Sequence, residues 1–99
     1  MANEAYWRKR DRKLTRRAKR IWRVLFGQQF PSDWNFVWYF LGATDHQCKQ
    51  LLLVDGLEDR HAVDTLCHEF LHIKCPLKRH GKAFDKLVKK MVKVAEVVK

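Results

Sequence analysis

The sequence predicts a small α+β domain in which amphipathic helices flank a short β-rich segment. Residues 4–26, 57–75 and 83–98 place apolar side chains at steps of three and four, the spacing of a helix with one buried face. Residues 35–54 are rich in aromatic and β-branched side chains, which is typical of strands. The chain has 99 residues, of which 46% are hydrophobic. This length suits one domain, residues 1–99, with one modest core.

The first predicted helix, residues 4–26, is amphipathic and strongly basic. Its apolar stripe contains Trp7, Leu14, Ala18, Ile21, Trp22 and Leu25, and Gly27 is suited to end it. The other face is almost entirely Arg and Lys, in a chain with a net charge of +10. Such a face can bind a nucleic-acid backbone without reading its sequence, here through Arg8, Arg12, Arg16, Arg20 and Arg23. A solvated charged face and a helix on a membrane surface are the alternatives.

The middle of the chain predicts a small antiparallel sheet of two or three strands. Residues 35–41 and 49–54 are the two expected strands, paired antiparallel, and residues 42–47 between them are polar and turn-like. A weaker third candidate is residues 28–30. The aromatic side chains here are expected in the core rather than in a ligand cage: Trp34, Trp38 and Tyr39.

The helix predicted over residues 57–75 contains His68-Glu69-Phe70-Leu71-His72, an H-E-x-x-H motif. Residues four apart lie one above the other on a helix, so the imidazoles of His68 and His72 can reach one ion. Glu69 lies about 100° round the helix, where its carboxylate can take a proton from a water on that ion. This is the arrangement of zinc hydrolases. The alternative is a solvated helix face that holds these residues by chance.

Flanking residues support a helix with one buried face. Its apolar stripe contains Ala62, Val63, Leu66, Phe70 and Ile73. Asp55 and Glu58 have the spacing of a capping box, and Pro76 follows the expected end. Asp64, one turn before His68, is expected to orient that ligand. The last helix, residues 83–98, is expected to pack on the sheet and on the motif helix.

A catalytic zinc site needs a third protein ligand and an open position for water. The downstream candidates are Cys75, His80, Asp85 and Glu96. Cys75 lies on the same face, about 4.5 Å further along the helix axis than His72. If the last helix folds back, Glu96 overshoots the site by roughly 12–18 Å. Asp85 is within reach but is the less common ligand here, so we expect His80 to complete a site for one zinc ion per chain.

Two motifs together resemble the SprT-like zinc metallopeptidases. His68-Glu69-Phe70-Leu71-His72 is followed by His80-Gly81-Lys82-Ala83-Phe84, and that family's pattern is H-E-x-x-H, a short spacer and H-G-x-x-F or a close variant. The match covers roughly the second half of the chain and includes the approach through Asp64-Thr65-Leu66. The resemblance implies a minimal zincin-like fold, zinc on His68, His72 and His80, and Glu69 as general base. The minigluzincins, minimal zincins of similar size, are a neighbouring family that uses a Glu instead of His80.

The resemblance also implies a substrate. In zincins, an edge strand beside the active-site helix lines the cleft and can pair with an extended peptide. Residues 49–54 lead into that helix and are the expected edge strand, with a buried core strand as the alternative. Some SprT-like proteins cleave proteins on DNA, so the basic first helix suggests a DNA-associated protein substrate.

A rival hypothesis is a non-catalytic, zinc-stabilised module that binds nucleic acid or another partner. Cys75 would then close a four-ligand site with the three histidines. A zincin-shaped remnant without activity is a third hypothesis. Three cysteines without a paired framework indicate reduced, mostly buried thiols. The chain shows neither a membrane-length apolar run nor a signal peptide, so we expect a cytoplasmic protein.

Overall fold

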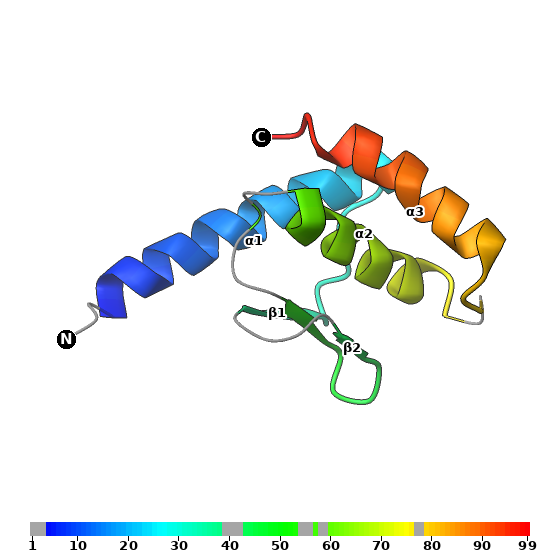
Figure 1. Ribbon diagram of the computed structural model, residues 1–99. Coiled ribbons are helices and arrows are strands. Elements are labelled where there is room, and N and C mark those ends of the chain that lie inside the picture. The colour runs from blue at the N-terminus through cyan, green and yellow to red at the C-terminus, as the bar shows by residue number, and fades with distance from the viewer. Residues whose placement is uncertain (1–3, 39–42, 54–56, 58–59, 77–78) are drawn as a thin grey trace.

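The computed structural model describes residues 4–38, 43–53, 57, 60–76 and 79–99, except for the side chains of residues 4–8, 43 and 52. Their elements are α1 (Glu4–Phe26), β1 (Asn35–Trp38), β2 (Ala43–Asp45), β3 (Gln50–Leu53), α2 (Arg60–Lys74) and α3 (Lys82–Ala95). Within this part of the chain, three helices and a three-stranded mixed sheet form a small α+β domain (Figure 1). The predicted α+β class is confirmed.

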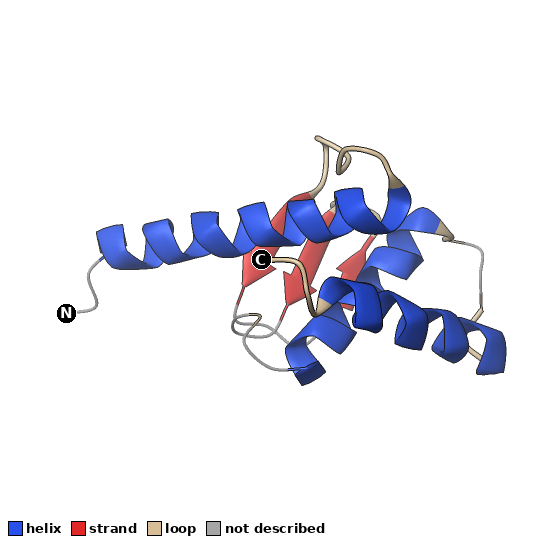
Figure 2. Ribbon diagram, turned by 90° about the horizontal axis from the view of Figure 1, so that it is seen from above, coloured by secondary structure: helices blue, strands red, loops and turns tan. Residues whose placement is uncertain are grey.

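The helices lie on one side of the sheet, and the N-terminal half of α1 extends beyond it (Figure 2). The C-terminus of the chain returns to the middle of α1. Arg17 makes this junction, because its Nε donates to the carbonyl of Val98 at 3.1 Å and its Nη1 to that of Leu57 at 2.6 Å. Arg17 therefore belongs to the packing of the domain rather than to the free basic face of α1.

The core is an aromatic cluster where α1 meets α2 and the sheet. Phe70 of α2 is fully buried, and Trp22 of α1 and Phe30 surround it at centroid distances of 5.1 and 5.7 Å. Phe36 of β1 lies 6.4 Å from Phe70 and stacks on Trp38 at 5.9 Å. The predicted apolar stripe of α2 is thus buried against the rest of the molecule. Trp38 is in the core as expected, and Tyr39 lies outside the described residues.

The sheet differs from the prediction in its topology. Its strand order is β1-β3-β2, with β1 parallel to β3 and β2 antiparallel to β3. The expected antiparallel pairing of residues 35–41 with 49–54 is wrong. The polar segment 42–47 contains β2, and residues 28–30 form no strand.

The turn after β2 explains this topology. The Asp45 carboxylate accepts hydrogen bonds from the backbone N–H groups of Gln47 and Cys48, both at 3.0 Å, and Lys49 has a φ of 52°. An Asp that bonds the backbone two residues on is a characteristic turn former. The chain reverses here, between β2 and β3, so β2 occupies one side of β3 and β1 can pair only on the other. β3 is therefore the central strand, and the expectation that residues 49–54 form an edge strand is wrong.

β2 is the edge strand of the sheet on the side of α2. Thr44 pairs in register with Leu51, which pairs with Phe36 on the other side. Residues in register share one face of a sheet, and Leu51 is fully buried. Thr44 thus lies on the face that the helices cover.

The two later helices are close to their predicted ranges. α2 begins at Arg60, and the capping-box residues Asp55 and Glu58 lie outside the described residues. Its last turn closes with the N–H of Cys75 donating to the carbonyl of Leu71 at 2.8 Å, directly before Pro76. α3 covers residues 82–95 and packs on α2, as predicted, but its main packing is on helices rather than on the sheet.

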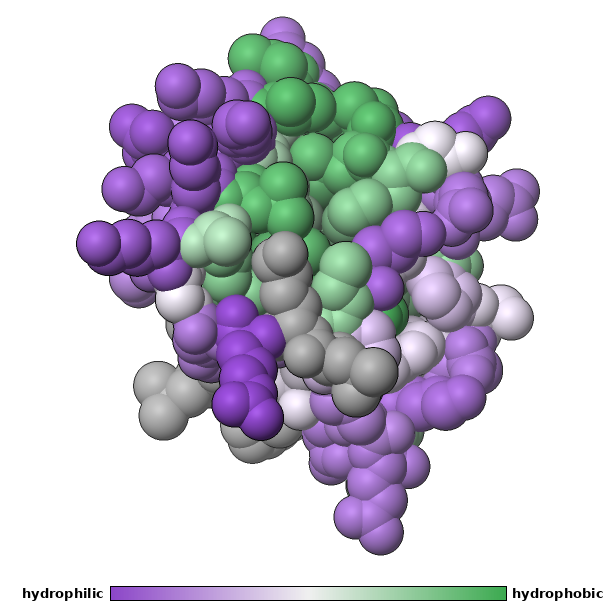
Figure 3. Space-filling model, turned by 90° about the vertical axis from the view of Figure 1, so that its right-hand side faces the viewer, coloured by the Kyte–Doolittle hydropathy of each residue, from purple (hydrophilic) through white to green (hydrophobic). Residues whose placement is uncertain are grey.

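The face of the molecule shown in Figure 3 carries an apolar area among hydrophilic side chains. Among the side chains that the structure describes, the large apolar ones that stay exposed are Val24, Leu87, Val94 and Val97. All three cysteines are free, and Cys48 in the turn after β2 is exposed rather than buried. Among the described helices, none combines the length and the apolar character that a membrane span requires.

Candidate metal centre

Three histidines from two segments meet at one end of α2. His68 and His72 stand on consecutive turns of this helix, and His80 comes from the loop before α3. The Nε2 atoms of His68 and His72 are 3.1 Å apart, and those of His72 and His80 are 2.8 Å apart. One ligand atom from each residue lies within 4.8 Å of the other two, so the triad can bind a metal ion.

The donor set fits a zinc ion. Zinc binds imidazole nitrogen at about 2.0–2.1 Å in tetrahedral geometry, which places two ligand nitrogens about 3.3 Å apart. The observed separations of 3.1 and 2.8 Å are close to this spacing. The described residues place no fourth protein ligand in the group.

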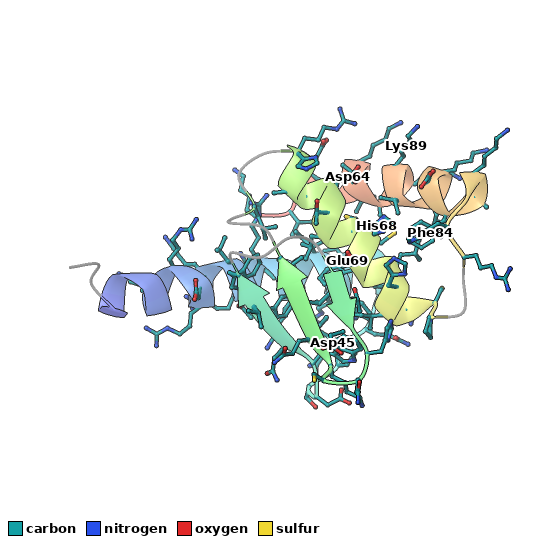
Figure 4. All side chains as sticks on the ribbon, turned by 60° about the horizontal axis from the view of Figure 1, so that its bottom comes forward. Asp45, Asp64, His68, Glu69, Phe84 and Lys89 are labelled. Carbon is teal, nitrogen blue, oxygen red and sulfur yellow. The ribbon has the colours of Figure 1, made fainter. Side chains whose placement is uncertain are left out.

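The ring of Phe84 packs against all three imidazoles. Its ring is fully buried on the first turn of α3, and its centroid lies 4.9 Å from His68, 5.0 Å from His72 and 4.9 Å from His80. Aromatic rings at such distances restrict one another's orientation. Phe84 therefore holds a loop histidine and two helical histidines against a common surface. Figure 4 shows His68 and Phe84 side by side between α2 and α3.

The environment of His72 favours its neutral form. Burial lowers the pKa of this imidazole below the usual 6.5, and the charges of His68, His80 and His46 lower it further. A metal binds an imidazole only through a deprotonated nitrogen. His72 is therefore ready to act as a ligand at neutral pH.

Glu69 lies on the sheet-facing side of α2 (Figure 4). Only 5% of its surface is exposed, and among the residues that the structure describes it is the one charged residue that is buried. The hydroxyl of Thr44 donates to its Oε1 at 3.0 Å. A buried carboxylate needs such a donor, because it has left the hydrogen bonds of water. The residue proposed as general base is thus held between the metal-binding helix and the edge strand.

A pocket of about 240 Å³ opens beside the triad, on the side of α3. Its lining consists of Asp64, His68, Asp85, Val88 and Lys89. Asp64 shares this pocket with His68, but in the described part of the chain no hydrogen bond joins the two side chains. The orienting role of Asp64 stays a prediction. Burial of the Cys67 thiol raises its pKa to about 12, and the negative charge of Asp64 contributes to this shift.

The other candidates for a third ligand lie outside the triad. Cys75 is half-buried against the core, and Asp85 is exposed in the pocket beside His68. Glu96 lies at the far end of α3, where its carboxylate pairs with Arg60 at 3.0 Å. The overshoot expected for Glu96 follows from the antiparallel return of α3 along α2 (Figure 1).

The basic residues of α1 form a separate surface. Arg12, Arg16, Arg20 and Arg23 are exposed, whereas the side chain of Arg8 lies outside the described residues. A groove of about 560 Å³ runs along this helix, lined by Lys9, Asp11, Arg12, Thr15, Arg16 and Lys19. The four exposed arginines come from one helix, so they form a continuous positive strip at helical spacing.

Two residues of the centre were not anticipated. Phe84 is the last residue of the H-G-x-x-F pattern, and that spacing is a signal that could have identified it. Thr44 has no comparable signal, because its contact with Glu69 depends on β2 being the edge strand. Comparisons with family models, with curated proteins and with solved structures found no match to this chain.

Proposed function

We propose that this protein is a zinc-dependent peptidase that uses water to hydrolyse peptide bonds. The observation that carries the proposal is the meeting of three imidazoles, with no fourth protein ligand among the described residues, on the helix that also carries a buried glutamate. The H-E-x-x-H and H-G-x-x-F pair supports a relationship to the SprT-like metallopeptidases and a minimal zincin-like fold.

His68, His72 and His80 would hold the metal, and Glu69 would move the proton. Held by these three histidines, a zinc ion would supply Lewis-acid chemistry, that is, a water of pKa about 7 and a polarised peptide carbonyl. The Glu69 carboxylate accepts the proton of the attacking water and then delivers it to the leaving amine. Asp64 is proposed to orient His68 from the neighbouring turn.

β2 is the proposed docking strand for the substrate. It is one of the two edge strands of the sheet and the one that adjoins α2, so its outer backbone groups can pair with an extended peptide. Main-chain pairing does not depend on particular substrate side chains. This arrangement suits an enzyme that cleaves flexible segments of many proteins.

The basic strip of α1 supports a narrower proposal, in which the substrate is a protein bound to DNA. The exposed arginines are suited to phosphate, and they lie on a helix other than the one that carries the metal site. DNA and zinc can therefore be bound at the same time. The rival, a closed zinc module, receives less support, because Cys75 lies outside the histidine group.

Cleavage of an unfolded protein substrate, such as labelled casein, tests the proposal. Zinc-loaded protein is compared with Glu69→Gln and with the matched control Glu96→Gln, which changes an exposed glutamate at the far end of α3. We expect Glu69→Gln to lose at least about a hundredfold in kcat, a typical contribution of a general base. Glu96→Gln should keep full activity. Equal cleavage by the wild type and Glu69→Gln contradicts the proposal, as does persistence of cleavage after the metal is removed.

A further inference from the structure

We infer that Thr44 is a positioning residue for Glu69: its hydroxyl holds the carboxylate in the orientation needed for proton transfer and ties it to the edge strand β2. The inference rests on the proposed function, because it assigns a role within the same site. It concerns a residue outside both sequence motifs.

The contact joins two side chains from different elements. The Thr44 Oγ1 donates to Glu69 Oε1 at 3.0 Å and lies 3.4 Å from the backbone carbonyl oxygen of the same residue. The carboxylate distance is the shorter, and an ionised acceptor attracts the single hydroxyl proton more strongly than a carbonyl does. In the described part of the chain, Thr44 is the hydrogen-bond donor of this buried carboxylate.

The donor is held more rigidly than the acceptor. A glutamate side chain has three rotatable bonds, whereas the β-branched side chain of Thr44 has one stiff torsion. The backbone of Thr44 is fixed in addition by pairing with Leu51 on the central strand. The sheet therefore determines where the hydroxyl lies, and the hydroxyl limits where the carboxylate can turn.

The hydrogen bond leaves part of the carboxylate available. A carboxylate has two oxygens and about four acceptor positions, and Thr44 uses one position on Oε1. Among the residues that the structure describes, none donates to Oε2, so this oxygen can accept a proton. A fixed Oε1 and a free Oε2 give a base whose geometry is set before the substrate arrives, which is the condition for efficient proton transfer.

Three single variants separate positioning from folding. Thr44→Val removes the hydroxyl and keeps the branched shape, and Thr44→Ser keeps the hydroxyl. Thr65→Val is the matched control, because it removes a threonine hydroxyl that bonds the carbonyl of His61 on the same helix. For Thr44→Val we expect kcat to fall by about tenfold or more, with KM and zinc affinity within about twofold, since the group acts only in the chemical step. Thr44→Ser should restore most of kcat, and Thr65→Val should behave as wild type.

A measurement without turnover tests the contact itself. The thermal midpoint of the zinc-loaded protein is measured for Thr44→Val in the wild-type background and in the Glu69→Met background. A hydrogen bond to a buried charge, worth about 1.5–3 kcal/mol, moves the midpoint of a domain of this size by roughly 6–24 °C. We expect that loss when Glu69 is present and a loss below about 2 °C when it is Met, because no charge is then left without a donor.

The outcomes distinguish this inference from the proposed function. If the wild type cleaves substrate but Thr44→Val keeps its kcat, or loses the same midpoint in both backgrounds, the positioning role is overturned and the peptidase proposal stands. A loss of kcat that Thr44→Ser does not restore also overturns it. If the zinc-loaded wild type cleaves no substrate, the proposed function fails and the positioning role fails with it, whatever the thermal coupling.

Discussion

Removing the imidazole of His80 tests whether the three histidines act as one metal site. His80 is exposed in the loop before α3, so His80→Ala leaves no cavity in the core. The matched control is His61→Ala, which removes an exposed histidine of α2 outside the triad. Both variants lose one exposed imidazole, and only His80→Ala loses a ring nitrogen that lies 2.8 Å from another ligand nitrogen.

The expected magnitude follows from the energy of zinc sites. Structural zinc in small domains binds with an apparent free energy of about 10–16 kcal/mol, shared by four ligands. One ligand is thus worth about 3 kcal/mol, or roughly a hundredfold in Kd. Competition with a chromophoric zinc chelator should show that loss for His80→Ala and a change within about twofold for His61→Ala. A hundredfold weaker site also loses about 2.7 kcal/mol of the stabilisation that saturating zinc confers, visible as a lower thermal midpoint.

Two results refute this reasoning. Purified wild-type protein that takes up no stoichiometric zinc removes the metal site altogether. Equal zinc affinities of His80→Ala and His61→Ala show that the 2.8 Å approach of His80 to His72 has no part in binding. The second result leaves a two-histidine site on α2, for which the neighbouring acidic side chains of the pocket become the next ligands to test.

Three further outcomes are expected. Zinc affinity and the stability of the metal-free protein should both decrease as the pH falls below 6.5. The pKa of His72 is lower in the folded protein than in the unfolded chain, so the unfolded chain takes up this proton first. Chelator competition and thermal unfolding between pH 8 and 5 measure the two effects, and pH-independent stability through that window contradicts the prediction. Phe70→Ala should lower the free energy of unfolding in a urea titration by about 3–5 kcal/mol, because the ring is fully buried among three other aromatic rings. A loss below about 1 kcal/mol is incompatible with that packing. Charge reversal at Arg16 and Arg20 should weaken duplex DNA binding and reduce the slope of log K against log salt concentration by about two, since each phosphate contact adds about 0.9 to that slope. Fluorescence anisotropy at several salt concentrations measures the slope, and an unchanged slope means that the DNA binds elsewhere.

The helices and half of the candidate site could be predicted from the sequence because both depend on local spacing. The apolar steps of residues 4–26 predict α1 at its observed bounds, and Gly27 ends it with a φ of 65°. His68 and His72 face the same way because four residues make about one helical turn, whatever the rest of the chain does. The place of His80 near them follows from a short loop that lets α3 return along α2.

The sheet and the support of the site were decided by the tertiary structure. Strands of three and four residues do not specify in their own pattern which neighbour they pair with or in which direction, so the turn at Asp45 and the place left beside β3 determined the topology. Thr44 reaches Glu69 across 25 residues of sequence only because β2 became the edge strand. Phe84 meets all three imidazoles because α3 packs on α2. Periodicity determines which face a side chain occupies, whereas contacts between elements depend on the packing of the whole chain.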